Sequence, residues 1–315
     1  MEKVLITGGT GFLGRALAQK LKREYQVFIC GRNNTQNSFA QMTTGCQAIP
    51  ADIASMESIR DAFNQVNPDI VIHAAATKFV DISEREPFEA VDINVNGSAN
   101  VARLAIDRKC KMVIGISTDK AAPPITNTYA LTKALMERMY CTSNGRSETK
   151  FACVRFGNIA WSSGSVFPIW KKMVRLHGKI ESTGPHMRRY LISADKAAEL
   201  VIRAIDNIDL IQGGVLIPDM KAILIKDVLN IFAEQAKVEW VQIPSRPGER
   251  VDEYLLGEAE LEYSHELMID NLKHFLYSPN KKSAVPITTV VSSQVAEHFT
   301  NDEILSFINE DPSDS

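Results

Sequence analysis

Short apolar runs alternate with amphipathic stretches along the first half of the chain. Apolar and β-branched residues cluster in six runs, at positions 4–7, 26–30, 46–51, 70–73, 112–116 and 150–155. Between these runs, apolar residues recur with helical spacing at positions 13–23, 56–65, 87–109 and 128–143. Strands that alternate with helices predict a parallel sheet whose connections cross over through the helices. We therefore expect an α/β protein with a doubly wound parallel sheet of the Rossmann type.

The regular alternation weakens after Arg155. A segment that mixes turn residues with aromatics follows, and a helical and a strand-like stretch then return at 194–208 and 213–219. We therefore expect a Rossmann domain and a smaller C-terminal mixed α/β lobe that binds substrate. The expected Rossmann domain comprises residues 1–164 and part of 190–236, the lobe 165–189 and 237–280, and an extended arm with a short terminal helix 281–315.

The composition argues against several functional classes. The 315 residues are 45% hydrophobic with a net charge of −3, so we expect no strongly basic surface for nucleic acid or an anionic membrane. The apolar runs are short and Met1 leads directly into the first strand, so we expect neither a membrane span nor a signal peptide. Five scattered cysteines without metal-binding spacing indicate reduced thiols in a cytoplasmic protein and no metal site.

A glycine-rich turn joins the first strand to the first helix. In "VLITGGTGFLGRAL", Gly8 allows a tight turn, Gly11 lets the backbone approach a diphosphate, and Gly14 lets the helix pack closely on the strand. The free N–H groups and positive dipole end of the helix would then face the diphosphate. Many strand–turn–helix connections use glycines, but at the first turn of an alternating pattern they predict a dinucleotide site. The same turn contributes Thr10, Phe12 and Leu13.

The end of the second strand indicates which dinucleotide is bound. An NAD site usually carries an acidic residue there, whereas this chain has Arg32 followed by Asn33. A guanidinium suits the 2′-phosphate of NADP, and Asn33 can add a hydrogen bond. Arg32 could instead be a solvated surface side chain. NADP is therefore favoured, and NAD stays an alternative.

Two further strand ends are expected to contact the same cofactor. Asp52 ends the third strand next to Ile53 and can accept a hydrogen bond from the adenine amino group. After the fourth strand, Ala74, Ala75 and Ala76 supply small side chains where the backbone passes close to the cofactor.

Residues with reactive side chains follow the fifth strand. The stretch "GISTDKAAPPITNTYALTK" delivers Thr118, Asp119 and Lys120 to the carboxyl edge of the sheet, where parallel sheets bind their ligands. Tyr129 and Lys133 are four residues apart and share one helix face. A tyrosine–lysine pair at this spacing is common by chance, so its context decides how it is interpreted.

That context favours catalysis over an exposed lysine beside a half-buried tyrosine. The pair follows a dinucleotide loop, a strand-end hydroxyl and a helix that contains Asn94, which we expect to lie beside the cofactor. A tyrosine with a pKa of about 10 is a poor base at neutral pH. A neighbouring ammonium and the positive nicotinamide favour the phenolate, so Tyr129 can take a proton from a sugar hydroxyl while hydride leaves for the nicotinamide.

These residues resemble the extended short-chain dehydrogenase/reductase superfamily. Within it, "STDKAAPPITNTYALTK" is similar to the signature of the nucleotide-sugar 4,6-dehydratases that act on UDP-N-acetylglucosamine, the polysaccharide-biosynthesis group. Other blocks of that group are similar to four further stretches of this chain, in the same order: "HAAATKFVDISEREPFEAVDINVNGSANV", "VRFGNIAWSSGSVFPIW", "MRRYLIS" and "RPGERVDEYL". The resemblance covers almost the whole chain.

The resemblance implies a role for each residue near the fifth strand. Tyr129 oxidises C4 of the sugar with NADP⁺, and Thr118 hydrogen-bonds the C4 oxygen. Lys120 removes the C5 proton and Asp119 protonates the departing C6 hydroxyl, after which hydride returns to C6. A plain epimerase or reductase needs no such carboxylate–amine pair. Without the resemblance, Asp119 and Lys120 could be a solvated charged pair that opens a loop.

Substrate contacts are implied in the same way. Asn158, Ser165 and Val166 would hold phosphate or sugar, and Lys78 would line the pocket. Each could instead be an ordinary surface residue.

Charged residues further along the chain complete the implied substrate site. Arg189 and Arg246 are diphosphate partners, and Glu249 and Glu253 bond the nucleotide ribose or hold their loop. Each of these could also be a surface charge.

The sequence departs from the group at Thr77, Ala130 and Arg188. Ala130 should be harmless, whereas Thr77 and Arg188 are expected near the substrate and leave the sugar and the nucleotide open. One alternative is a nucleotide-sugar 4-epimerase or 4-ketoreductase, in which Asp119 and Lys120 are dispensable. Another is a non-catalytic NADP-binding scaffold. Group members pair through helices corresponding to 87–109 and 128–143, which implies a homo-oligomer.

Overall fold

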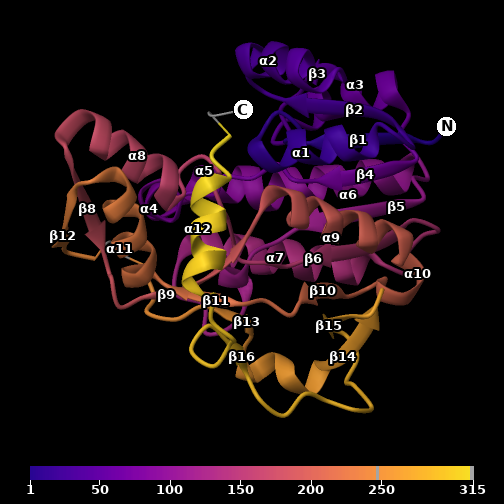
Figure 1. The fold of residues 1–315 in the computed structure, drawn as a ribbon. Coiled ribbons are helices and arrows are strands. Elements are labelled where there is room, and N and C mark those ends of the chain that lie inside the picture. The colour runs from indigo at the N-terminus through magenta and orange to yellow at the C-terminus, as the bar shows by residue number, and fades with distance from the viewer. Residues whose placement is uncertain (246–247, 313–315) are drawn as a thin grey trace.

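The computed structural model describes residues 1–245 and 248–312, and its centre is a nine-stranded sheet (Figure 1). The strand order is β14-β15-β10-β6-β5-β4-β1-β2-β3. Strands β10 to β3 run parallel, whereas β15 and β14 form an antiparallel edge. The bounds are β1 (Lys3–Thr7), β2 (Gln26–Gly31), β3 (Gln47–Pro50), β4 (Ile70–His73), β5 (Met112–Ile116), β6 (Lys150–Val154), β10 (Val215–Pro218), β14 (Ser264–Ile269) and β15 (Leu272–Tyr277). The predicted Rossmann-type fold class is confirmed.

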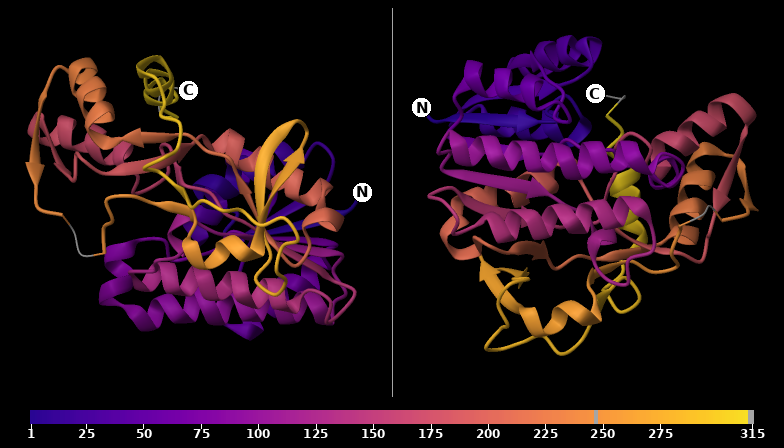
Figure 2. Two further views of the ribbon diagram at one scale, coloured as in Figure 1. Left: turned by 90° about the horizontal axis from the view of Figure 1, so that it is seen from below. Right: turned by 180° about the vertical axis from the view of Figure 1, so that it is seen from behind.

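Helices cover both faces of the sheet (Figure 2). One face carries α1 (Phe12–Leu21), α2 (Asn34–Thr44), α9 (Ala194–Asp206) and α10 (Ile208–Ile211). The opposite face carries α3 (Met56–Val66), α6 (Ser98–Asp107) and α7 (Thr128–Ser143), preceded by the short α4 (Val80–Arg85) and α5 (Pro87–Val91). The views from below and from behind show α6 and α7 side by side on the outside of the molecule.

Two helices differ from the sequence prediction. The stretch 34–44 was not predicted to be helical because it has few apolar residues, but α2 is capped at both ends. Asn33 Oδ1 accepts a hydrogen bond from the backbone of Gln36 at its start, and Gly45 ends it with a φ of 72°. The single helix expected at 87–109 is divided into α5, a π-helical turn at Asp92–Gly97 and α6. The π turn places Asn94 beside the cleft.

A smaller lobe with its own core stands at one side of the sheet. It contains β7 (Asn158–Ile159), α8 (Val166–His177), β8 (Lys179–Thr183), β9 (Arg188–Ile192), β11 (Ala222–Leu224), α11 (Ile225–Ala236) and β12 (Glu239–Ile243). Stacked and edge-on aromatic rings form its centre, among them Phe167, Trp170 and Phe232. Helix α12 (Asn301–Asn309) packs against this core through Ile304, Phe307 and Ile308.

The C-terminal third differs from the expected division of the chain. Residues 237–280 were assigned to the lobe, but the hairpin β14–β15 extends the large sheet because β15 pairs with β10. Beyond it, β16 (Val291–Ser292) pairs with β13 (Tyr254–Leu256), and short 3₁₀ turns lie at Asp119–Ala121 and Glu258–Tyr263. The arm therefore crosses the sheet edge and returns to the lobe through α12 (Figure 1).

Three further expectations concern the whole chain. All five cysteines are buried and free, as expected of reduced thiols. Within 1–245 and 248–312, no helix has the length and apolar character needed to cross a membrane. Over the same ranges, no group of three or more His, Cys, Asp or Glu side chains is arranged to hold a metal ion.

Candidate active site

A cleft of about 970 Å³ lies between the carboxyl edge of the parallel strands and the lobe. This is the upper end of the range for small-molecule sites. Of the residues proposed from the sequence, all but three line this cleft. Asp119 and Asn94 are fully buried behind its wall, and Arg246 lies outside the described residues.

The glycine-rich turn has the geometry that a dinucleotide loop requires. Gly8 has a φ of 68°, and a side chain there would meet the backbone of Ala75 at 2.6 Å. A side chain at Gly14 would lie 2.5 Å from the carbonyl oxygen of Gly8, so helix α1 could not pack on the turn. A Cβ atom placed at Gly11 would meet the carbonyl oxygen of Gly8 at 3.2 Å and no other atom within 4 Å among the described residues. Gly11 also lines the cleft. The turn and the N-terminus of α1 therefore fit a diphosphate.

The end of β2 places Arg32 at the rim of the cleft. Its side chain is 61% exposed, and its guanidinium lies 3.5 Å from the carboxylate of Glu89 on α5. The side-chain oxygen of Asn33 caps helix α2, so its expected hydrogen bond to a 2′-phosphate would have to come from the amide nitrogen. Two residues beyond β3, Asp52 Oδ1 already accepts the backbone N–H of Ala54 at 3.0 Å.

Asn94 supports the cofactor side of the cleft from behind. Its Oδ1 accepts the backbone N–H of Thr77 at 2.8 Å, while Nδ2 donates to the Thr77 carbonyl at 2.9 Å and to Thr132 at 3.0 Å. These bonds account for both ends of the amide group. Asn94 therefore fixes the backbone that follows Ala76, and its predicted role beside a cofactor would be to support that backbone.

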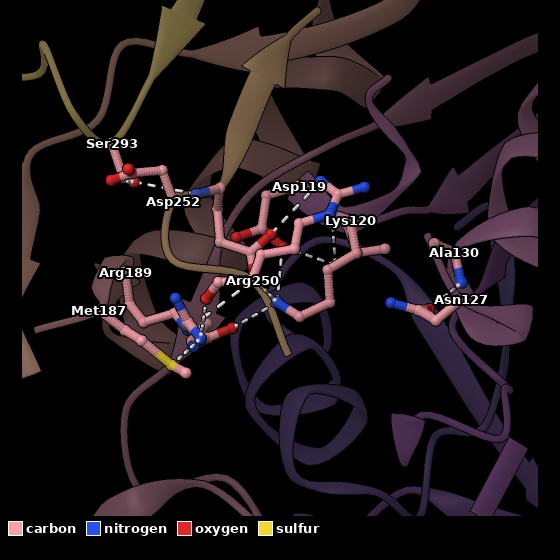
Figure 3. Close-up of polar contacts among 12 residues, drawn as sticks. Asp119, Lys120, Asn127, Ala130, Met187, Arg189, Arg250, Asp252 and Ser293 are labelled. Carbon is pink, nitrogen blue, oxygen red and sulfur yellow. Dashed lines mark hydrogen bonds and ion pairs between the residues drawn. The ribbon is translucent and has the colours of Figure 1, made fainter. Parts of the chain in front are cut away.

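The loop after β5 holds Lys120 in a cage of oxygen atoms (Figure 3). Its Nζ lies 3.0 Å from Asp119 Oδ1, 3.1 Å from Asn158 Oδ1 and 3.4 Å from Glu253 Oε1. Burial alone lowers the pKa of Lys120, but the charges of Asp119 and Glu253 outweigh burial and raise this pKa above its ordinary value. Asp119 lies behind, where its Oδ1 also accepts the hydroxyl of Thr118 at 2.9 Å.

Tyr129 is the second residue of helix α7, whose first turn is capped by Asn127. Burial raises the pKa of Tyr129 to about 12, while the charge of Lys120 and the hydroxyl of Thr118 act in the opposite direction. The ammonium that partly offsets the effect of burial on Tyr129 is therefore that of Lys120, in the loop after β5. This finding differs from the expectation that the pair on one helix face suggested.

Lys133 is almost completely buried one turn further along α7. Its Nζ contacts the sulfur of Met136 at 3.1 Å. Burial lowers the pKa of Lys133 to about 8, although Cys153 and Glu137 act in the opposite direction. Lys133 lines the same cleft as Tyr129 and the glycine-rich turn.

The lobe supplies the other wall of the cleft. Ser165 and Val166 begin helix α8, and the buried hydroxyl of Ser165 has no hydrogen-bond partner within the described residues. Lys78, which also lines the cleft, belongs to the loop between β4 and α4 and not to the lobe. Its Nζ lies 5.7 Å from the ring centre of Phe79. Glu249 accepts the hydroxyl of Thr183 at 3.0 Å.

The paired arginines of "MRRY" point in different directions. Arg189 lines the cleft but donates to the backbone carbonyls of Arg188 at 2.7 Å and Arg250 at 2.9 Å. Arg188 pairs with Asp252 at 3.0 Å outside the cleft. The expectation that Arg188 lies near the substrate is therefore wrong, because successive side chains of strand β9 face opposite sides.

Sequence reasoning missed Arg250. Its guanidinium contacts Glu253 at 3.7 Å and donates to Thr126 at 3.1 Å and to the carbonyl of Pro124. It thereby ties the proline-rich loop before Tyr129 to the segment that contains Glu253. The spacing of three residues between Arg250 and Glu253 was visible in the sequence, but their contact partners were not.

The fold and the cleft place the protein in the extended short-chain dehydrogenase/reductase superfamily. Its similarity to a dehydratase and an epimerase of nucleotide sugars makes it an enzyme that modifies nucleotide sugars. Within this class the chain belongs to the polysaccharide biosynthesis protein family, which matches residues 4–270.

Two curated relatives indicate two related chemistries. The chain is 29% identical to the inverting UDP-N-acetylglucosamine 4,6-dehydratase of Campylobacter jejuni, over 84% of this chain and 80% of that protein. It is 33% identical to a UDP-glucose 4-epimerase of Rickettsia bellii, over 84% of this chain and 81% of that protein.

Solved structures share the same fold. Pen from Bacillus thuringiensis is 28% identical and superposes with a TM-score of 0.90 over 98% of this chain and 97% of that one. A UDP-glucose 4-epimerase of Thermus thermophilus in complex with NAD is 21% identical, with a TM-score of 0.70 over 79% of this chain and 88% of that one.

Proposed function

We propose that the protein is an NADP-dependent 4,6-dehydratase that converts UDP-N-acetylglucosamine to a UDP-2-acetamido-2,6-dideoxy-4-hexulose. The observation that carries the proposal is the ion pair of Lys120 and Asp119 at the end of β5, 3.0 Å apart, with Lys120 in the cleft. A reaction that only exchanges hydride at C4 needs no second acid–base pair beside Tyr129. Loss of water needs both a base for C5 and an acid for the C6 oxygen.

The residues of the cleft divide this chemistry between them. A nicotinamide dinucleotide held by the glycine-rich turn would supply the acceptor for hydride from C4 of the sugar and the donor of that hydride to C6. Tyr129 takes the proton of the C4 hydroxyl, and the resulting ketone acidifies the C5 hydrogen. Lys120 removes that hydrogen as a proton. Transfer of a proton from Nζ of Lys120 to Asp119, 3.0 Å away, leaves the amine neutral as the base for C5 and the carboxyl protonated as the acid for the departing hydroxyl. Asp119 is fully buried, and its Oδ1 accepts the hydroxyl of Thr118.

The cofactor assignment rests on the glycine-rich turn and on Arg32. The turn accepts the diphosphate of either dinucleotide, whereas a guanidinium at the end of β2 is suited to a 2′-phosphate. Arg32 is exposed and its present partner is a surface glutamate, so a phosphate can compete for it.

We also propose that two copies pair through α5, α6 and α7. This face is uncovered and exposes apolar side chains at Phe88, Val91, Leu131 and Leu135. Leu131 and Leu135 are one turn apart on α7, where a second copy would bury both.

Mass spectrometry in D₂O tests the reaction. UDP-N-acetylglucosamine, incubated with the purified protein and no added cofactor, should give a product lighter by one water with one deuterium at C5. The variant Lys120→Ala should retain NADP but release no water, while Lys111→Ala, at a surface ion pair with Glu2, should behave as wild type. Normal turnover by Lys120→Ala would remove the base assignment.

A 4-epimerase is the second candidate, favoured by the 33% identity to the Rickettsia enzyme. It predicts a product of unchanged mass with C4 inverted, which proton NMR detects. It also predicts that Lys120→Ala retains activity, because C4 epimerisation breaks no bond at C5.

A further inference from the structure

Three oxygen atoms surround the nitrogen of Lys120, one for each hydrogen of an ammonium group. Asp119, Asn158 and Glu253 each place one oxygen within 3.4 Å of Nζ. A neutral amine has only two N–H bonds, so three acceptors favour the charged form. A base that removes the C5 proton must be neutral when it reacts. The partners of Lys120 therefore control when it can act.

Glu253 differs from the other two partners because it comes from a distant segment. Asp119 adjoins Lys120 in the chain, and Asn158 is neutral. The side chain of Glu253 is only 3% exposed, and its carboxylate also lies 3.8 Å from Arg189 and 3.7 Å from Arg250. One of its oxygens, Oε2, is buried without a hydrogen-bond partner among the described residues. A carboxylate enclosed by three cations is poorly suited to the ribose contact expected from the sequence.

The arm fixes the position of Glu253. Its backbone N–H donates to the hydroxyl of Ser293 at 2.9 Å, and its carbonyl accepts the N–H of Ser293 at 2.8 Å. The same hydroxyl donates to Asp252 at 3.2 Å, on the other side of the chain (Figure 3). Ser293 is fully buried. Ser293 thus holds this segment by two bonds to the backbone of Glu253 and one to the side chain of Asp252.

We propose that Glu253, held in place by Ser293 of the arm, is a positioning residue that keeps Nζ of Lys120 between Asp119 and Asn158 and retains its proton until substrate is bound. The proposal rests on the assignment of Lys120 as the base in the proposed function. The negative charge of Glu253 attracts the ammonium of Lys120, while Arg189 and Arg250 attract the Glu253 carboxylate. The charged and titratable groups around Lys120 are thus Asp119, Glu253, Arg189 and Tyr129, with Arg250 behind Glu253.

The variant Glu253→Gln removes the charge and keeps the shape. An opposite charge at this distance raises a lysine pKa by about one unit or more. Without it, the neutral fraction of Lys120 below its pKa should rise about tenfold. Trace labelling with acetic anhydride from pH 8 to 11, followed by peptide mass spectrometry, measures that fraction directly. The acid limb of the pH profile of kcat should move down by about one pH unit, with KM little changed.

Asp252→Asn is the matched control. Asp252 is the adjacent carboxylate, but it faces Arg188 and not Lys120, and an asparagine oxygen can still accept the hydroxyl of Ser293. The variant should therefore leave the labelling profile of Lys120 unchanged. If Glu253→Gln does not fold, Glu253→Asp retains the charge but draws it back by one methylene, and faster labelling of Lys120 is again expected.

The outcomes separate this inference from the proposed function. Faster labelling of Lys120 in the Glu253 variant but not in Asp252→Asn supports the positioning role, even if no nucleotide sugar is turned over and the dehydratase assignment fails. Labelling and pH profiles that coincide with wild type would overturn the positioning role, even if the protein proves to be a dehydratase.

Discussion

Arg155 at the end of β6 offers the sharpest test of what holds the sheet to the C-terminal segment. Its side chain is fully buried and makes two bonds to Glu137 at 2.9 and 2.6 Å, two to Glu260 at 2.8 Å, and one to the carbonyl of Leu255 at 2.8 Å. Breaking one buried ion pair by removing a partner costs roughly 3–5 kcal/mol. Arg155→Met leaves two buried carboxylates without their cation, so the loss should reach at least about 4 kcal/mol at pH 7.

The pH dependence of that loss checks its cause. A buried carboxylate without a cation can take up a proton, which at pH 7 costs about 3.7 kcal/mol relative to an ordinary glutamate. The variant's folded state then binds more protons than wild type. Its deficit should therefore shrink by about 1.4 kcal/mol per pH unit for each carboxylate protonated, or about 2.7 kcal/mol between pH 7 and pH 5.

Urea unfolding followed by circular dichroism is the appropriate assay, because all three tryptophans lie in the lobe and would not report on the sheet. Combining Arg155→Met with Glu137→Gln and Glu260→Gln should abolish the pH dependence of the deficit, since no carboxylate remains to face the former position of the guanidinium. A deficit of less than about 1 kcal/mol at pH 7, or one that is the same at pH 5, would refute the reasoning.

Three other variants test separate parts of the molecule. Burial lowers the pKa of His73 to about 3, so the stability that this neutral side chain contributes is present above about pH 6.5 and is lost as the pH falls. Below pH 6, the unfolding free energy of wild type should fall by about 1.4 kcal/mol per pH unit more than that of His73→Gln, as measured by urea unfolding. Arg32→Gln should weaken NADP binding about 10- to 100-fold and leave NAD binding unchanged, as measured by fluorescence titration; equal weakening of both would contradict the 2′-phosphate assignment. Leu131→Glu should convert a dimer to a monomer in light scattering, with Met42→Glu, exposed on α2, as its control.

Sequence reasoning predicted the turns and strand ends of the parallel sheet more fully than the structure of the lobe. Gly8, Gly14 and the strand ends follow local rules, because turn geometry and strand edges are set by residues close together in the chain. Helix α2 was missed because its caps at Asn33 and Gly45, rather than apolar spacing, define it. The hairpin β14–β15 was assigned to the lobe because alternation along a strand does not reveal which sheet it joins.

The contacts of charged residues were the hardest to predict. The sequence placed Asp119 and Lys120 together, but not Glu253, which lies more than 130 residues further on and reaches Lys120 through the fold. It also gave Arg188 and Arg189 similar surroundings, whereas the strand turns them to opposite sides. Such pairings depend on long-range packing, and no local pattern records them.

The placement of the lobe within the chain has an evolutionary consequence. The chain leaves the sheet at Val154 to build β7, α8, β8 and β9, and returns to it at Val215, next to where it left. It leaves again at Pro218 to build β11, α11 and β12, and comes back in the hairpin β14–β15, whose second strand pairs with β10 beside the point of departure. Insertions and deletions in these two excursions leave the register of the parallel strands untouched. A lineage can therefore exchange its sugar specificity while it inherits the dinucleotide half unchanged.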